Sequence, residues 1–238
     1  MTIRERLNLL YEKPPLQVTY PAGKKLVFMS DSHLGFDKFM GNYRVHLEAL
    51  KHYFEAGYMV IFLGDHYDLW RKDNLTEIKN ELLYLCDFED LYQSLLRIGG
   101  NHDRILGFPE AVLITVGEDQ FFCAHGHQGD WINDEGWELG RALVRYPLNA
   151  MEELGIDTSK FPGSDQHHAD QRIDLIDWAN EREVVSIFGH IHLMEHVGFY
   201  WNCGSGIGDG RECIEYDGEL KLKRWTNSIS NLGVTATR

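Results

Sequence analysis

The sequence predicts a layered α/β domain in which buried strands alternate with helices along most of the chain. Short apolar runs such as Tyr58–Leu63 and Val184–Phe188 have strand length and are typical of strands buried on both faces of a sheet. Between such runs, Tyr43–Ala56 carries apolar residues at helical spacing and is followed by Gly57, a residue common after the end of a helix. This alternation favours sheets covered by helices.

The other elements follow the same pattern. Residues 14–24 contain Pro14, Pro15 and Pro21 and are expected to form a loop. A second helix is expected at Leu75–Tyr92. Further strands are expected at Lys25–Ser30, at Ser94–Ile98, and at Ala111–Val116 and Gln120–Ala124, which form a hairpin. Gly-punctuated strands follow Met194 and end near Trp225.

Residues 128–183 differ from the rest because they are polar and have helical periodicity in Leu139–Val144 and Ile173–Ala179. They predict a helical insertion or lid within a single domain that spans residues 1–238. Aromatic side chains of this insertion that could line a pocket are Trp131, Trp137, Tyr146 and Phe161.

The amino-acid composition limits the kinds of molecule that the protein is expected to bind. The chain of 238 residues has 23 Lys and Arg against 37 Asp and Glu, a net charge of −14, which disfavours nucleic acids and anionic membrane surfaces. No stretch approaches the ~18 apolar residues of a membrane span. The four cysteines form no C-x-x-C pair, so we expect a reduced, cytoplasmic protein. The oligomeric state is left open.

Side chains that can bind metals directly follow five of the predicted strands. Each pair alone is a weak signal, but the carboxyl ends of strands in an open α/β sheet meet where ligands bind. The five together therefore predict one metal site. They are Asp31 with His33, Asp65 with Asp68, Asn101 with His102 and Asp103, His125 with His127, and His190 with His192.

The ligand types indicate the metal. Carboxylates, imidazoles and a carboxamide without thiolates suit Mn²⁺, Fe or Zn²⁺. About seven ligands exceed what one ion needs, whereas two ions that share a carboxylate would use them all. Two such ions ~3.5–4 Å apart form a clamp suited to phosphoryl hydrolysis.

The motifs D-x-H, G-D-x-x-D, G-N-H-D, H-G-H and G-H-x-H occur in this order over residues 31–192 and resemble those of the calcineurin-like metallophosphoesterases. The resemblance implies a two-sheet β-sandwich flanked by helices, with two divalent ions, preferably Mn²⁺, at the strand ends. It also implies the ligands: Asp31, His33 and His192 for one ion, Asn101, His125 and His190 for the other, and Asp65 as the bridge.

The same resemblance implies that His102 is not a ligand but the general acid, paired with Asp68. A neighbouring carboxylate favours a protonated imidazole, which is suited to protonating a departing alkoxide. The alternative is that His102 only supports its loop. Three further residues are candidates for substrate contacts: Arg71, Arg104 and His127. For the two arginines the alternative is a solvated position. His127 lies two positions after the implied ligand His125.

The expected function is hydrolysis of a phosphomonoester or phosphodiester in a small phosphorylated substrate, by a metal-bridging hydroxide with His102 as acid. One alternative is a pyrophosphohydrolase of a nucleoside-diphosphate conjugate. Three features resemble the UDP-2,3-diacylglucosamine pyrophosphohydrolases: Trp70, the segment from His168-Ala-Asp170 through Phe188-Gly-His190, and a helical insertion before G-H-x-H. Those enzymes, however, have Arg at the position of His102. An alternative of another class is a non-catalytic metal-binding scaffold.

Overall fold

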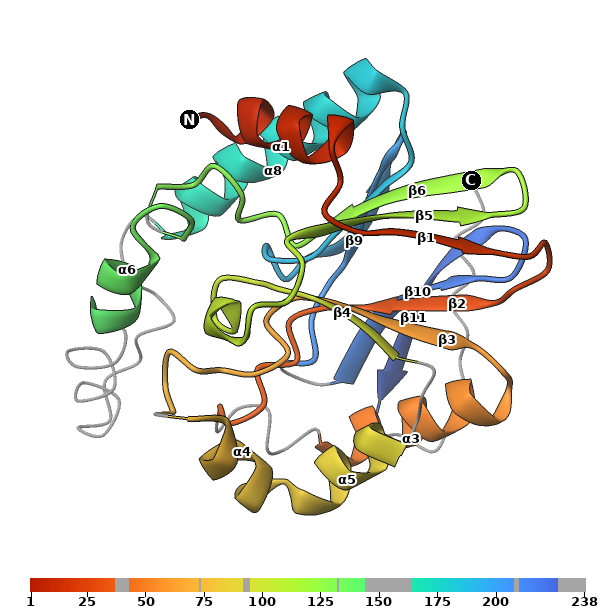
Figure 1. Ribbon diagram of the computed structural model, residues 1–238, viewed down its shortest axis with the longest axis vertical. Helices are drawn as coiled ribbons and strands as arrows, with labels where there is room; N and C mark the ends of the chain where they lie inside the picture. Colours follow the sequence, from red (N-terminus) through yellow and green to blue (C-terminus); the bar gives the residue numbers. More distant parts are fainter. Residues whose placement is uncertain are drawn as a thin grey trace.

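The fold is described by a computed structural model. It describes residues 1–36, 43–72, 74–91, 95–131, 133–143, 164–207 and 210–226. Two β-sheets pack face to face, and helices cover the outer face of each (Figure 1). The prediction of a two-sheet β-sandwich flanked by helices is therefore confirmed.

One sheet has five strands in the order β11-β10-β2-β3-β4. Strands β2, β3 and β4 run parallel, and β10 pairs antiparallel with β2. The strands are β2 (Leu26–Met29), β3 (Met59–Leu63), β4 (Leu95–Ile98), β10 (Gly210–Tyr216) and β11 (Leu220–Thr226).

The other sheet has six strands in the order β1-β5-β6-β7-β9-β8. The predicted hairpin is confirmed as the antiparallel pair β5 and β6, and β7 lies parallel to β6. The strands are β1 (Gln17–Tyr20), β5 (Ala111–Val116), β6 (Asp119–Ala124), β7 (Ser186–Phe188), β8 (Met194–Val197) and β9 (Tyr200–Cys203).

Helices α1 (Ile3–Glu12) and α8 (Ser164–Arg182) lie side by side over the six-stranded sheet (Figure 1). Helices α3 (Tyr43–Glu55), α4 (Leu75–Glu81) and α5 (Leu83–Leu91) lie under the five-stranded sheet. The short helix α6 (Trp137–Leu143) and a 3₁₀ turn at Arg104–Leu106 complete the described elements.

Three details differ from the sequence-based expectations. Strand β1 lies within residues 14–24, so the prediction of a loop there is wrong; it pairs in parallel with β5. The helix expected at 75–92 is interrupted at Leu82, whose side chain is buried in the core. Helix α1 was not expected; it begins with a capping box in which Thr2 and Glu5 satisfy free N–H groups of the first turn.

The predicted insertion at 128–183 contains α6 and α8 in its described part. Trp131 is largely exposed, whereas Trp178 is buried against the six-stranded sheet. Residues 144–163, with Tyr146 and Phe161, lie outside the described residues.

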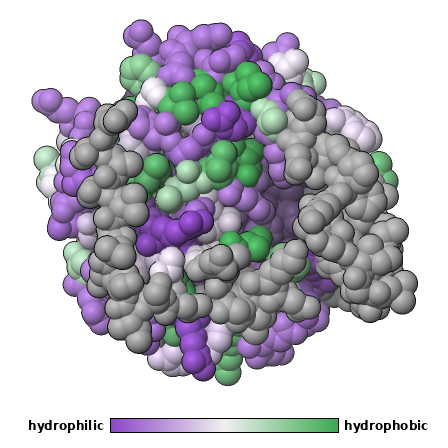
Figure 2. Space-filling model, turned by 180° about the vertical axis from the view of Figure 1, so that it is seen from behind, coloured by the Kyte–Doolittle hydropathy of each residue, from purple (hydrophilic) through white to green (hydrophobic). Residues whose placement is uncertain are grey.

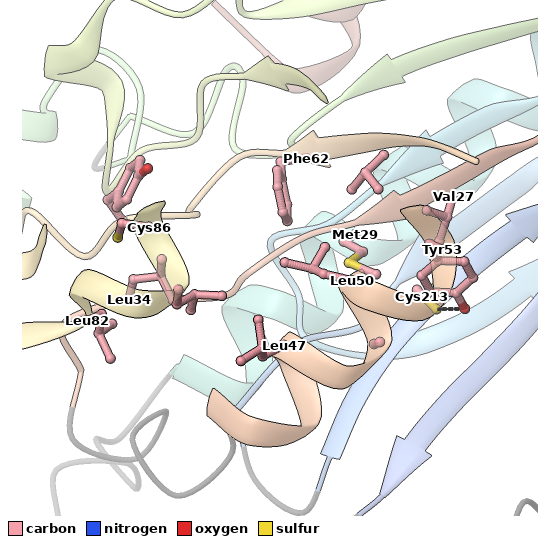
Figure 3. Packing of buried hydrophobic residues seen from close by; sticks show 14 of the residues in the cluster. Val27, Met29, Leu34, Leu47, Leu50, Tyr53, Phe62, Leu82, Cys86 and Cys213 are labelled. Atoms are coloured by element: carbon pink, nitrogen blue, oxygen red, sulfur yellow. Dashed lines mark hydrogen bonds between the residues drawn. The ribbon is translucent and has the colours of Figure 1, made fainter. Parts of the chain in front are cut away.

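The apolar core has three layers: one between the sheets and one under each group of helices. Strand β2 contributes to two of them, because Leu26 and Phe28 face the opposite sheet while Val27 and Met29 face helix α3. Figure 3 shows Leu50 of α3 beside Met29. This two-sided burial explains why β2 and β3 are continuous apolar runs.

The surface is mostly polar. On the face shown in Figure 2, hydrophilic residues surround small separate apolar clusters. All four cysteines are free and buried. Within the described ranges, no helix combines the length and apolar composition needed to cross a lipid bilayer.

Replacing Leu50 by Ala tests the core under α3. Leu50 is fully buried, so its truncation should lower the free energy of unfolding by about 2–5 kcal/mol, through lost burial and the cavity left behind. Urea unfolding monitored by circular dichroism measures this change. The control is Leu83→Ala, at a side chain 57% exposed, which should change stability by less than about 0.5 kcal/mol. Equal effects of the two substitutions would contradict the described packing.

Candidate metal centre

The carboxyl ends of β2, β3, β4, β6 and β7 meet at one edge of the sandwich, as expected from the sequence. A cavity of about 210 Å³ opens there. Eight of its lining residues were predicted site residues: His33, Asp65, Asp68, Arg71, Asn101, His102, His190 and His192. The structure thus brings together side chains from both sheets that are up to 159 positions apart.

A first group of potential ligands consists of Asp31, His33 and His192, whose ligand atoms lie within 4.8 Å of one another. The Nε2 atoms of His33 and His192 are 3.3 Å apart. Asp31 Oδ1 lies 3.1 Å from His192 Nε2 and 3.7 Å from His33 Nε2. The other oxygen of Asp31 accepts hydrogen bonds from the Ser30 hydroxyl and the His190 N–H, so Oδ1 alone faces the imidazoles.

A second group consists of Asp65, His125 and His190, whose ligand atoms also lie within 4.8 Å of one another. His125 Nε2 lies 3.1 Å from Asp65 Oδ2. His125 Nδ1 donates a hydrogen bond to the Leu63 carbonyl at 2.6 Å, which directs Nε2 toward the group. Asn101 lines the adjoining cavity.

Asp65 lies between the two groups. Its Oδ1 accepts a hydrogen bond from the His102 N–H at 2.8 Å. Its Oδ2 lies 3.1 Å from His125 Nε2 and 3.8 Å from His33 Nε2. One oxygen therefore faces both groups, as the predicted bridging role requires.

Several buried atoms of these groups make no hydrogen bond with the described part of the chain. An unpaired buried polar group costs about 1–3 kcal/mol, so their concentration in one place indicates that they bind something else. Oxygen and imidazole ligands without thiolate fit Mn²⁺, Fe or Zn²⁺, and the residues therefore fit the implied divalent ions. The atoms are Asp31 Oδ1, Asn101 Oδ1, His125 Nε2 and His190 Nε2.

The electrostatics of the site also favour cations. Burial lowers the pKa of His33, but the neighbouring carboxylates of Asp31 and Asp68 outweigh burial and raise that pKa to about 10. Burial likewise lowers the pKa of His125, whereas the charges of Asp65 and Asp31 raise it to about 9. The buried carboxylates thus draw positive charge, whether from protons or from metal ions.

The backbone of the site adopts an uncommon conformation. Asp31, His33, Asp65, His190 and His192 all have φ between 47° and 70°. In this left-handed region residues other than glycine are strained by roughly 1–2 kcal/mol each. A hydrogen bond of 2.9 Å from the His33 N–H to the Asp65 carbonyl helps to hold two of them. All five are predicted metal ligands, and such strain concentrates at functional sites.

Two glycines allow the strand ends to approach this closely. A β-carbon at Gly64, where φ is 88°, would lie 2.6 Å from His125 Nδ1. A β-carbon at Gly100 would overlap Asp65 Oδ1. The glycines of the G-D and G-N motifs are therefore required because ligand side chains occupy the space of a β-carbon.

His102 lies at the cavity beside the two groups. Its Nδ1 is 2.9 Å from Asp68 Oδ1, and its ring stacks on Trp70 at a centroid distance of 4.3 Å. The Trp70 indole donates a hydrogen bond to the Asn101 carbonyl, which fixes the stacked pair to the adjacent loop. This arrangement orients the His102 ring, with Nδ1 as the nitrogen that contacts Asp68.

Asp68 orients two imidazoles at once. Burial raises the pKa of Asp68, but the charge and hydrogen bond of His102 hold it well below its usual range, so the carboxylate is ionised and accepts hydrogen bonds. Its Oδ2 lies 3.2 Å from His33 Nδ1, while its Oδ1 faces His102. One carboxylate thus positions a predicted metal ligand and the predicted general acid.

The three predicted substrate contacts lie in different surroundings. Arg71 lines the cavity, with its guanidinium 4.1 Å from the centre of the Phe36 ring. The structure does not bring Arg104 to the cavity, because its guanidinium donates to the carboxylate and carbonyl of Asp134 at 2.6 and 2.7 Å. His127 is buried outside the cavity lining; burial and the charge of His125 lower its pKa to about 3.

Four lining residues were not predicted from the sequence: Phe36, Asn133, His168 and Ile207. None belongs to a metal-ligand motif; Phe36 lies close after His33 in the sequence, whereas tertiary packing brings the other three to the cavity. His168, on helix α8, lies in a segment that the sequence had marked only by resemblance.

Comparison with solved structures finds distant likenesses. A conserved uncharacterized protein and predicted phosphoesterase from Streptococcus pneumoniae is 19% identical, with 85% of this chain and 89% of that chain covered and a TM-score of 0.42. A cold-active protein-tyrosine phosphatase from Shewanella sp. is 16% identical, with 87% and 78% covered and a TM-score of 0.39. A protein serine/threonine phosphatase from Saccharomyces cerevisiae is 14% identical, with 98% and 90% covered and a TM-score of 0.45.

No curated protein matches the chain. The family described as calcineurin-like phosphoesterase matches residues 24–194, which contain every predicted metal ligand. Because this match spans well over half of the sequence, the chain belongs to the calcineurin-like phosphoesterase family.

Proposed function

We propose that this protein hydrolyses a phosphomonoester or phosphodiester bond with two divalent metal ions and His102 as general acid. The observation that carries the proposal is the pair of ligand groups that share Asp65 Oδ2. Several of their buried atoms make no hydrogen bond within the described residues, and Asn101 and His190, which hold two of these atoms, line the cavity beside His102. Family membership supports the same reaction class.

In this proposal, Asp31, His33 and His192 would hold one ion, Asn101, His125 and His190 would hold the other, and Asp65 would serve both. When bound, two such ions activate water and neutralise negative charge on the attacking and leaving oxygens. We prefer Mn²⁺ because of the mixed oxygen and imidazole ligands, and Fe or Zn²⁺ would fit the same set.

The chain itself supplies the proton for the leaving group. His102 Nδ1 donates its hydrogen to Asp68, so in the protonated imidazole Nε2 is the nitrogen that would give its proton to the departing oxygen. Stacking on Trp70 fixes the plane of the ring. Arg71 at the cavity is a candidate to contact the substrate phosphate.

The alternative of a nucleoside-diphosphate pyrophosphohydrolase has one structural feature in its favour. His168 of α8, within the predicted insertion, lines the cavity, so the insertion can contact a substrate larger than a simple ester. The presence of His102 in place of Arg still favours a phosphatase or phosphodiesterase.

The primary test is hydrolysis of a chromogenic phosphomonoester and the matching phosphodiester by metal-stripped protein resupplied with Mn²⁺. Turnover that requires Mn²⁺ and is absent from Asp65→Ala protein would support the proposal, and the preferred ester would distinguish phosphatase from phosphodiesterase. If neither ester is hydrolysed, a panel of nucleoside-diphosphate conjugates tests the pyrophosphohydrolase. No turnover on any substrate with two ions bound would favour a non-catalytic scaffold.

Asp65→Ala should weaken the binding of both ions, because its Oδ2 faces both ligand groups. Elemental analysis after dialysis against a fixed Mn²⁺ concentration measures the bound metal. The matched control is Asn101→Ala, which removes a ligand of one proposed site and should reduce occupancy of that site alone. Retention of two ions by Asp65→Ala protein would rule out the bridging role.

His102→Ala should lower turnover by about 10²–10⁴-fold for esters with poor leaving groups and leave metal content unchanged. The loss should be smaller for a nitrophenyl ester, whose leaving group departs without a proton. A series of esters with leaving groups of graded pKa measures the difference. An equal loss across the series would mean that His102 does not act as the general acid.

Asp68→Asn should have two effects, since an amide cannot accept hydrogen bonds through both of its polar atoms. It should lower turnover on poor leaving groups and also weaken metal binding by about 10–100-fold at the site containing His33. Calorimetric titration with Mn²⁺ separates these effects, because His102→Ala should change turnover only. Unchanged metal affinity in Asp68→Asn would show that Asp68 does not support His33.

A further inference from the structure

The carboxamide of Asn101 is directed by a neighbour from outside the metal-ligand motifs. Its Oδ1 is buried and makes no hydrogen bond with the described residues. Its Nδ2 donates a hydrogen bond of 3.2 Å to Asn133 Oδ1. Asn133 lies in the segment between the H-G-H motif and helix α6, and it lines the same cavity.

Asn133 is in turn held by a buried carboxylate. The Nδ2 of Asn133 donates a hydrogen bond to Asp130 Oδ2. The same oxygen accepts hydrogen bonds from Gln171 Nε2 at 2.8 Å and His167 Nε2 at 2.9 Å. Gln171 and His167 are four positions apart on α8 and therefore share one face of that helix.

This chain of hydrogen bonds has a fixed direction. An ionised carboxylate only accepts, so Asp130 requires Asn133 to turn its NH₂ group toward it. Asn133 then offers its oxygen to Asn101, which must donate its own NH₂ group. As a result Asn101 presents its oxygen, the only atom of the amide that can bind a metal ion, to the cavity.

We propose that Asp130 and Asn133 are positioning residues that set the orientation of the Asn101 amide and so determine the affinity of one metal site. Through Gln171 and His167, the same chain of hydrogen bonds ties that site to helix α8 of the predicted insertion. The inference rests on the proposed function, in which Asn101 is a metal ligand. It gives the insertion a role in metal binding.

The test is calorimetric titration of metal-stripped protein with Mn²⁺. Loss of a partner behind a metal ligand commonly weakens binding by about 10–100-fold. Asn133→Ala should weaken one of the two binding events by this factor and leave the other within about threefold. The control is Asp134→Asn, which changes an equally buried carboxylate of the same segment whose partners include Arg104, Arg6 and the Gly129 N–H. It should leave both events unchanged.

A pair of isosteric substitutions tests the direction of the hydrogen bonds. In Asp130→Asn, the new amide can donate from its NH₂ group to Asn133. The side-chain amides of Asn133 and Asn101 can then turn over, so that Asn101 no longer has to present its oxygen to the cavity. One of the two Mn²⁺ binding events should therefore weaken about tenfold or more. Adding Asn133→Asp places a carboxylate between the new amide and Asn101 and restores the wild-type net charge. Because a carboxylate only accepts hydrogen bonds, Asn101 must again donate its NH₂ group. The double variant should recover wild-type affinity within a few-fold.

The outcomes separate the two proposals. If wild-type protein binds fewer than two ions, the proposed function fails. If it binds two and Asn133→Ala changes neither event, or if the double variant fails to recover while thermal unfolding shows that it is folded, the positioning role is overturned.

Discussion

Three carboxylates buried at the strand ends set the conditions that the rest of the site must meet. Asp31, Asp65 and Asp68 are almost completely removed from solvent, and a buried charge is costly unless it is paired. Each directs at least one oxygen toward an imidazole: Asp31 toward His33, Asp65 toward His125, and Asp68 toward His33 and His102. The resulting demand for positive charge explains why histidines gather here and why divalent cations fit the site.

The backbone is organised around these carboxylates. The strand ends approach until a β-carbon at Gly64 or Gly100 would collide with a ligand side chain. The residues that follow the strands turn into the left-handed region, which separates successive side chains. Thus Asp31 and His33 face the metal groups, whereas Ser32 between them contacts His66 and Arg211 on the other side. Strain in this loop is balanced by polar contacts on both of its faces.

The sequence predicts the metal-ligand residues of the site better than the other residues that line the cavity. Predicted ligands such as Asp31 and Asp65 lie two positions after buried strands, so their position along the chain also determines their position in space. Asn133, which precedes α6, and His168 on α8 carry no such signal, because tertiary packing brings them to the cavity. Arg104 could not be distinguished from a substrate contact until its partner Asp134, which belongs to none of the motifs, was known.

In the fold, too, elements with a clear local sequence pattern could be predicted, whereas elements without one could not. Most strands and α3 could be predicted because their burial leaves an apolar pattern. Strand β1 is a short, half-buried edge strand with a weak pattern. Helix α1 did have signals, namely its capping box and the helical spacing of Ile3, Leu7 and Leu10, but its many charged residues obscured them. No feature of the local sequence marks the interruption at Leu82.

The division of the site between two sheets links its ligands to folding. Residues from β2 and β3 belong to one sheet, and those that follow β6 and β7 belong to the other, so the complete set exists only after the sandwich has assembled. A cation that requires the whole set binds the folded chain and not the unfolded chain. Its binding free energy therefore adds to the stability of the native state, by RT ln(1 + [ion]/Kd) for each independent site. The supply of metal ions would then influence how long the protein persists as well as whether it is active.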